Sequence, residues 1–238
     1  ADQVFFNSEF HMASFLDALP RFLRKFPDYR ELDSVNVIRG KSRILHLGMD
    51  LRQFDNHRTD RGDVPLILWN HRWQYDKSPN EFFNVLEKVR EYGNNFKLAI
   101  MGENFNQYPD IFIEAQKSFE DQIVQWGYAE SFTEYAQWLW KADILPVTSN
   151  QEFFGASVME AMYCDTWPLL PNRLTYPELL PPEQHQDHLY SNGQDLFNKI
   201  NWAIENYEQI KSLHFHSIAK PFDWEYMAPM YDNALEQI

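Results

Sequence analysis

Apolar runs of strand length alternate along most of the chain with segments whose apolar residues recur at helical spacing. Strands are predicted at 66–69, 96–101, 122–126, 143–147 and 167–170. Helices are predicted at 10–26, 78–92, 132–141, 156–163, 195–208 and 225–238. Because strand and helix alternate, the strands should be parallel and joined by right-handed crossovers. The pattern therefore predicts an α/β fold built on a doubly wound, Rossmann-like parallel sheet.

The predicted helix at 78–92 has the clearest start signal. Ser78 is expected to cap it, Pro79 suits its first turn, and Glu81 would complete a capping box. Its apolar side chains share one face, namely Phe82, Phe83, Leu86 and Val89.

The first 60 residues depart from this alternation. A short strand is predicted at 4–6, and short extended pieces are predicted at 35–38 and 44–47. The polar stretch 55–63 has the composition of a linker. Because the chain starts directly in a strand, we expect it to be a fragment whose earlier part is missing.

Charge and composition narrow the possible functions. Lys and Arg number 21 against 35 Asp and Glu, so the net charge is −14, which argues against gripping a polyanion by charge alone. It leaves room for a small phosphate site built from one or two cations. Hydrophobic residues make up 44% of the chain and exclude intrinsic disorder. The sequence has no membrane-length apolar run and no signal segment, so we predict a cytoplasmic protein without a membrane partner.

One candidate site follows the first predicted strand of the sheet. Ligands of open α/β sheets bind at the carboxyl ends of the strands, and here that end carries Arg72 and Lys77. A guanidinium and an ammonium at this place could clamp a diphosphate. The alternative is that both are surface cations paired with nearby carboxylates. His71 is either an acid–base residue or a hydrogen-bonded wall of the pocket.

A second candidate site follows the strand at 143–147. Glu152 would lie in the loop, and Gly155 would let the backbone approach a ligand closely. The helix that begins near Ala156 would direct its free N–H groups at that ligand, and Glu160 follows within the helix. The alternative is that Glu152 and Glu160 are solvated carboxylates.

No metal site is predicted. The pairs His185/His188 and His214/His216 have metal-binding spacing, but no cluster of carboxylates or cysteines completes either pair. Cys164 is the single cysteine, which excludes a disulfide framework. A glycine-rich dinucleotide fingerprint and a Walker lysine loop are both absent from the sequence.

Four stretches of the chain resemble retaining glycosyltransferases of the two-domain GT-B fold, in the family-four type (group 1). Residues 152–162, EFFGASVMEAM, resemble their Glu-x7-Glu motif, and 67–77, ILWNHRWQYDK, resemble the first strand and loop of their donor-binding domain. Residues 44–54 and 7–16 resemble segments at the end of their N-terminal domain. Five short stretches are similar in sequence to the tRNA-queuosine α-mannosyltransferase branch of this group, namely WNHRW, MGENF, WGYAES, QEFFG and YPEL.

The resemblance implies a domain division and an activity. Residues 1–60 would be the remnant of the N-terminal acceptor domain with its linker, 61–220 the nucleotide-sugar donor domain, and 221–238 a C-terminal crossover helix. The implied activity is retaining, metal-independent transfer of a hexose, mannose from GDP-mannose, to queuosine in tRNA. The tRNA would bind through the missing domain, and this chain alone is expected to be inactive.

The resemblance also implies roles for individual residues. Arg72 and Lys77 would hold the diphosphate, and Glu152 would bind the hydroxyls of the donor sugar. Glu160 would take the ribose diol. The remaining donor-binding residues would be His71, Phe154, Gly155, Ala156, Ser157 and, facing the base, Gly127 and Tyr128. His11 lies in the remnant of the first domain, but nothing in the sequence assigns it the family's catalytic-zone histidine role.

Two alternatives to this activity stay open. The chain could be a non-catalytic domain that binds nucleotide sugars and kept the pocket. It could also be a GT-B transferase whose donor is a UDP- or ADP-sugar, because the sequence of the base-facing loop does not reveal the base.

Overall fold

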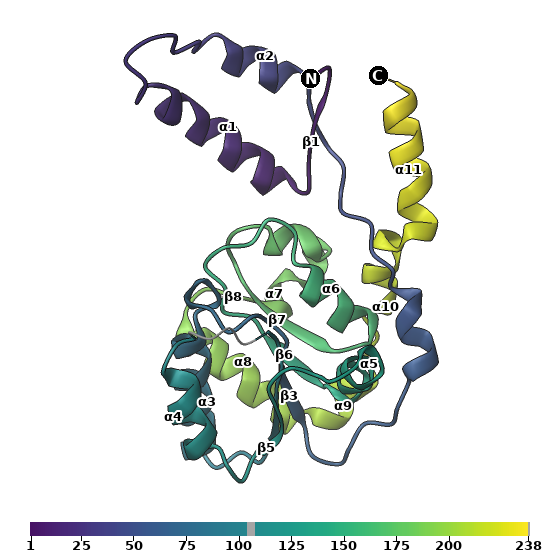
Figure 1. Ribbon diagram of the computed structural model, residues 1–238. Helices are drawn as coiled ribbons and strands as arrows, with labels where there is room; N and C mark the ends of the chain where they lie inside the picture. The colour runs from purple at the N-terminus through teal and green to yellow at the C-terminus, as the bar shows by residue number, and fades with distance from the viewer. Residues whose placement is uncertain (104–107, 238) are drawn as a thin grey trace.

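The computed structural model describes residues 1–103 and 108–237, so the last two residues of MGENF lie outside the description. The described residues form two parts (Figure 1). The larger part is a six-stranded parallel sheet with helices on both faces. The smaller part holds a two-stranded parallel sheet, β1 (Val4–Phe6) and β2 (Ser42–Ile44), and three helices.

The large sheet has the strand order β5-β4-β3-β6-β7-β8, and all pairs are parallel. Its strands are β3 (Leu66–Trp69), β4 (Lys97–Ile100), β5 (Ile123–Trp126), β6 (Ile144–Pro146), β7 (Trp167–Pro171) and β8 (Leu189–Tyr190). Counted from its first strand, this is the order 3-2-1-4-5-6 of a doubly wound sheet, which confirms the predicted fold class. The winding direction reverses between β3 and β6, and this switch point is where such sheets bind ligands.

Helices cover both faces of this sheet, which explains why its central strands are apolar on both sides (Figure 1). They are α3 (Pro79–Glu91), α4 (Ile111–Ser118), α5 (Phe132–Lys141), α6 (Ala156–Tyr163), α7 (His185–His188), α8 (Gly193–Glu205), α9 (Tyr207–Lys211) and α10 (His216–Ala219). Short 3-10 turns join them, η1 (Arg52–His57), η2 (Tyr75–Lys77), η3 (Tyr176–Leu179), η4 (Pro182–Gln184) and η5 (Lys220–Phe222). The prediction missed α4, the four-residue helices α7 and α10 and the two-residue β8, and the helix expected at 195–208 is divided at Asn206.

The helices of the smaller part are α1 (Glu9–Leu23), α2 (Ser34–Gly40) and α11 (Trp224–Glu236). The extended piece predicted at 35–38 is wrong, since these residues lie in α2. β1 pairs with 42–44 instead, so 35–38 have no neighbouring strand and satisfy their backbone hydrogen bonds within a helix. For the same reason only Ile44 of the predicted piece 44–47 belongs to a strand.

The predicted capping box at the start of α3 is also wrong. Ser78 ends η2 and precedes α3 in a left-handed conformation (φ 51°, ψ 53°), and its side chain does not cap the helix. The hydroxyl of Thr148 donates to the carbonyl oxygens of Lys77 and Ser78. The helix nevertheless begins at Pro79, as expected.

Two crossing segments connect the parts. Met49 donates its N–H to the carbonyl of Phe222 and accepts one from Trp224, both at 2.8 Å. The carboxylate of Asp223 accepts the N–H groups of Leu51 and Arg52. The stretch predicted as a linker, 55–63, is tied to the large part, because Arg61 donates to backbone carbonyls before β7.

Within 1–103 and 108–237, none of the helices has the length and apolar character needed to cross a membrane.

Candidate functional site

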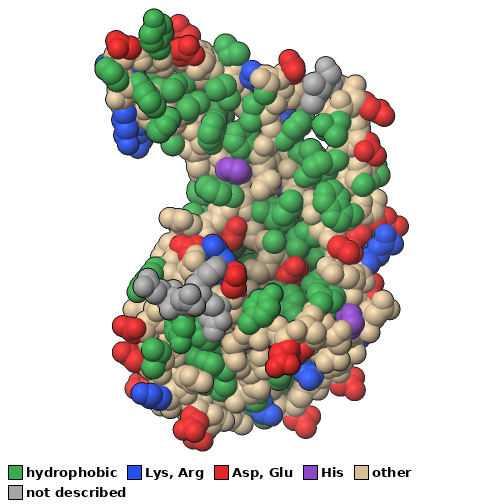
Figure 2. Space-filling view, in the orientation of Figure 1, with side chains coloured by type: hydrophobic (Ala, Val, Ile, Leu, Met, Phe, Trp, Pro, Cys, Tyr) green, Lys and Arg blue, Asp and Glu red, His purple; other side chains and the backbone are tan. Residues whose placement is uncertain are grey.

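A cavity of about 430 Å³ opens at the carboxyl end of the sheet, beside the switch point between β3 and β6. It is lined by Asn70, Arg72, Met101, Gly102, Glu103, Tyr128, Ala129, Glu130, Ser131, Phe132 and Tyr135. The surface is hollowed between the two parts of the molecule, and acidic and basic side chains lie together on the sheet side of the hollow (Figure 2). The loops after β3, β4 and β5 therefore share one cavity.

Arg72 and Lys77 are joined by a carboxylate. Oδ2 of Asp76 lies 3.6 Å from Nη2 of Arg72 and 3.8 Å from Nζ of Lys77. The Arg72 side chain is half exposed and lines the cavity, whereas Lys77 is buried. Lys77 is thus not a surface cation, and the two positive groups share one anion.

Glu152 meets the same cluster from the loop after β6. Its Oε2 lies 3.2 Å from Nζ of Lys77, and its Oε1 accepts the N–H groups of Phe153 (3.0 Å) and Phe154 (3.3 Å). Burial raises the pKa of Glu152, but Lys77 and these hydrogen bonds outweigh that effect and leave it lowered. Glu152 is therefore a fixed, ionised carboxylate rather than a solvated one.

His71 is a buried, neutral histidine beside this cluster. Its Nδ1 lies 2.9 Å from Oγ of Ser157, while its Nε2 is buried without a hydrogen-bond partner among the described residues. Burial, reinforced by the charge of Lys77, lowers the pKa of His71 to about 3. Asn70 donates to the carbonyl of Ser157 at 2.7 Å, so two side chains of the β3 loop hold the first turn of α6.

The start of α6 is shaped by Gly155, whose φ is +93°. A side chain there would be strained in backbone and would approach Cδ1 of Leu179 to 3.1 Å. Ala156 is the first residue of α6. Phe154 is buried and packs edge-on against Phe222 of η5, so its ring points toward the crossing segments while its N–H serves Glu152.

Glu160 lies in α6 and is held by a neighbour from α5. The hydroxyl of Tyr135 donates to Oε2 of Glu160 at 2.6 Å. Burial raises the pKa of Glu160, and the hydrogen bond from Tyr135 opposes that rise. Because Tyr135 lines the cavity, Glu160 stands directly behind the cavity wall.

The loop predicted to face a base forms the far side of the same cavity. Gly127 is buried and donates its N–H to the carbonyl of Ile100 at 2.8 Å, which fixes the turn after β5. Tyr128 is 70% exposed and lines the cavity, as do the next four residues. An exposed aromatic ring at this place offers a surface on which a base can stack.

Of the site residues predicted from the sequence, Arg72 and Tyr128 line the cavity, and Lys77 and Glu152 are joined to Arg72 through Asp76. Glu160 lies behind the cavity wall, and the ring of Phe154 points away from the cavity. The roles of all these residues stay predictions. The structure adds Asn70, Asp76 and Tyr135, which the sequence reasoning missed. Tyr135 could have been found, because it lies one turn into the helix that follows the base-facing loop. The described residues contain no group of three or more histidines, cysteines and carboxylates placed to hold a metal.

Two family descriptions match the chain. Residues 52–216 match "Glycosyl transferases group 1", and residues 1–49 match "tRNA-queuosine alpha-mannosyltransferase N-terminal". The tRNA-queuosine alpha-mannosyltransferase of Drosophila melanogaster is 32% identical over 210 residues, which cover 84% of this chain and 54% of that protein. A probable sucrose-phosphate synthase of Thermosipho melanesiensis is 23% identical over 87% of the chain and 50% of its own length. The chain therefore spans about half the length of these relatives.

Solved structures share the fold over the whole chain. HepE of Anabaena in complex with UDP-glucose has a TM-score of 0.74 at 17% identity, with 100% of this chain and 64% of that chain covered. Sucrose-phosphate synthase of Thermosynechococcus elongatus has a TM-score of 0.71 at 20% identity, with 100% of this chain and 58% of that chain covered. At these identities the likeness shows the fold alone.

Proposed function

Because the chain belongs to the group 1 glycosyl transferases, we propose that its cavity binds a nucleotide-sugar donor and that the whole protein transfers a hexose from it. The proposed donor is GDP-mannose, and the proposed acceptor is queuosine in tRNA. The support for this donor and acceptor is the resemblance to the Drosophila mannosyltransferase, which is 32% identical over part of both chains.

The observation that carries the proposal is the cluster of Arg72, Asp76, Lys77 and Glu152 beside the cavity. In this cluster two cations face two carboxylates, since Lys77 is paired with both Asp76 and Glu152, whereas Arg72 is half exposed to the cavity and lies 3.6 Å from Asp76. The guanidinium of Arg72 is therefore the cation most accessible to an anion that enters the cavity. A diphosphate in the cavity would contact the guanidinium of Arg72 directly and would lie near the buried ammonium of Lys77. These charges would be in place before the reaction and would stabilise the diphosphate as it leaves the sugar.

The remaining groups suit the other parts of a nucleotide sugar. Glu152 is fixed by two N–H groups and would accept hydrogen bonds from the sugar hydroxyls. Glu160 would accept both hydroxyls of the ribose, and Tyr128 would lie against the base. Neutral His71 would present Nε2, which has no partner among the described residues, to a ligand oxygen or nitrogen. Cations of the chain itself would supply the positive charge, so we propose that transfer needs no metal.

Calorimetric titration of the chain with GDP, UDP, ADP and their hexose conjugates tests this proposal. We expect GDP and GDP-mannose to bind and the other nucleotides to bind at least about tenfold more weakly, with or without a chelator. Selective binding of UDP- or ADP-sugars would agree with the glycosyltransferase family but would contradict GDP-mannose as the donor. Binding of GDP-mannose without transfer, when the chain is joined to the rest of its protein, would favour a non-catalytic binding domain.

A further inference from the structure

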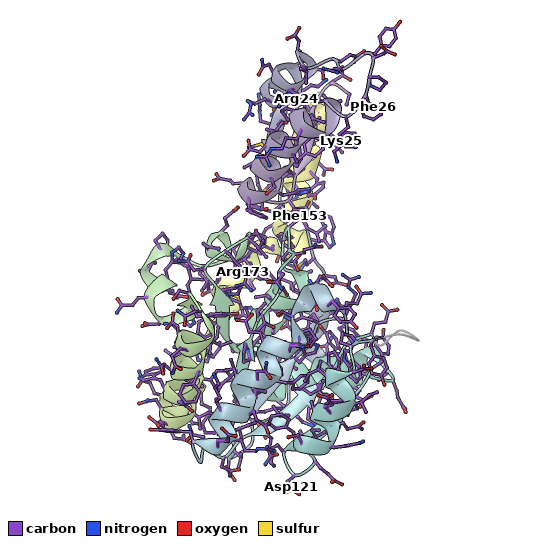
Figure 3. The ribbon with its side chains drawn as sticks, turned by 90° about the vertical axis from the view of Figure 1, so that its left-hand side faces the viewer. Arg24, Lys25, Phe26, Asp121, Phe153 and Arg173 are labelled. Carbon is purple, nitrogen blue, oxygen red and sulfur yellow. The ribbon has the colours of Figure 1, made fainter. Side chains whose placement is uncertain are left out.

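The first turn of α1 contacts the loop that carries Glu152. Oγ of Ser8 donates to the carbonyl oxygen of Phe153 at 2.7 Å and accepts the N–H of His11 at 3.0 Å. Ser8 is 2% exposed, so water cannot replace this bond at low cost. Figure 3 places Phe153 at the junction between the smaller part and the large sheet part.

A second bond pair fixes the same helix end to η3. The carboxylate of Glu178 accepts the N–H of Glu9 at 2.8 Å and the N–H of Phe10 at 2.7 Å. These are two of the N–H groups that a helix leaves without an internal partner, and a negative charge is favourable there. Glu178 therefore orients α1 relative to the large part.

An aromatic contact completes the junction. The ring of His11 stacks on the ring of Phe153 with centroids 4.2 Å apart and an interplanar angle of 24°. The ring of Phe10 lies close to the same ring, with its centroid 6.3 Å from that of Phe153. Phe153 is thus held by its carbonyl and by its ring.

These contacts reach the donor site through one peptide segment. The N–H groups of Phe153 and Phe154 donate to Oε1 of Glu152, so the position of this peptide segment helps to orient the carboxylate, whose Oε2 is held by Lys77. The segment lies in a loop between β6 and α6, and such loops move unless their backbone is tied down. Lys77 binds this loop at the carbonyl of Gln151 and at the carboxylate of Glu152. Ser8, which lies 145 positions from Phe153 in the chain, adds a bond at the carbonyl of Phe153.

We propose that Ser8 and Glu178 are positioning residues for the donor sugar. They hold the loop 152–154 against α1 so that the carboxylate of Glu152 stays in the orientation that meets the sugar hydroxyls. The smaller part thereby contributes to the donor site without lining the cavity. The identity of the ligand in this inference rests on the proposed function.

Ser8→Ala and Glu178→Ala test the inference through the affinity ratio of GDP-mannose to GDP. We expect GDP to bind each variant within about twofold of the unchanged chain, and GDP-mannose to lose about three- to tenfold. Glu178→Gln should recover part of this loss, because an amide oxygen still accepts one N–H. The matched control is Glu183→Ala, an exposed carboxylate in the neighbouring η4, which should change neither affinity.

A merely structural role would weaken both ligands together, so an unchanged GDP-mannose to GDP ratio in both variants overturns the inference. Amide hydrogen exchange provides a second test, which needs no ligand. Exchange at Phe153 and Phe154 should accelerate at least about fivefold in both variants, and equal rates would also overturn the inference. If GDP-mannose fails to bind the unchanged chain while exchange accelerates as expected, the proposed function fails and the tie between α1 and the loop stands.

Discussion

Nζ of Lys77 lies 3.2 Å from Oε2 of Glu152, although 75 positions separate the two residues in the chain. Both side chains are largely buried, at 9% and 21% exposure. The pair links the loop after β3 to the loop after β6 across the switch point of the sheet. A group proposed to hold the diphosphate and a group proposed to hold the sugar therefore position each other before any donor arrives.

Removing both members of this pair should destabilise the fold by less than the sum of the two single removals. Lys77→Met leaves the Glu152 carboxylate buried without its cation, and Glu152→Gln leaves the ammonium without its anion. We expect a coupling free energy of about 1–3 kcal/mol from a double-mutant cycle of chemical unfolding. Lys88→Met, which removes an exposed lysine from α3, should stay within about 0.5 kcal/mol. Additive single and double variants would show that the pair is not formed in solution.

Tyr135→Phe should change the pH dependence of nucleotide binding. Burial raises the pKa of Glu160 and the Tyr135 hydroxyl opposes that rise, so removing the hydroxyl lets the pKa rise further. In the proposed role an ionised Glu160 would accept both ribose hydroxyls, and protonation would remove that capacity. GDP affinity should therefore begin to fall at a higher pH in the variant when the pH is lowered. The affinity of 2′-deoxy-GDP, which lacks one hydroxyl, should respond less, and identical pH profiles for the unchanged chain and the Tyr135→Phe variant would refute the role of Glu160.

Asp143 should make the chain less stable as the pH rises. Burial raises its pKa from 3.8 to about 6, although the N–H of Leu66 and the charge of Arg61 oppose the shift. The folded state therefore holds a proton that the unfolded state has released between about pH 4 and about pH 6. The free energy of unfolding relative to Asp143→Asn should fall by up to about 3 kcal/mol across this range. Parallel stability curves for the two proteins would contradict the raised pKa.

Gly48 should tolerate no side chain where the two crossing segments meet. A Cβ at this position would lie 2.4 Å from the ring of Trp224, whereas a Cβ at Gly40 would meet nothing within 4 Å. Gly48→Ala should lower the free energy of unfolding by about 1–3 kcal/mol, and Gly40→Ala should leave it within about 0.5 kcal/mol. Adding Trp224→Ala should remove most of the Gly48→Ala effect. Equal stability of the two alanine variants would mean that Gly48 and the ring of Trp224 are not closely packed in solution.

The sequence predicts the large sheet well because its central strands β3, β6 and β7 are buried along their whole length and its helices are amphipathic. The proximity of Arg72, Lys77, Glu152 and Glu160 follows from the same pattern, since parallel strands end at one edge and their loops converge there. Apolar periodicity failed where the elements are short. Val35 to Ile38 carry an apolar alternation that suits a strand, but only the pairing of β1 with β2 decides that they form a helix.

Contacts between segments far apart in the chain could not be predicted from local sequence patterns. The left-handed backbone of Ser78 depends on the bonds from Thr148, which lies 70 positions away. The bond from Ser8 to Phe153 and those from α1 to Glu178 likewise join residues that share no spacing or motif. These contacts are set by how the two parts pack, so only the three-dimensional arrangement reveals them.

The central claim is that the cavity binds the diphosphate of GDP-mannose through Arg72. Its most direct test is a calorimetric titration of GDP-mannose into the chain, into Arg72→Ala and into Arg24→Ala. Arg24 follows α1 in the smaller part, far from the sheet (Figure 3). We expect Arg72→Ala to weaken binding about 10- to 100-fold and Arg24→Ala to leave it unchanged. Equal affinities for all three proteins, or no binding to any of them, would contradict the account.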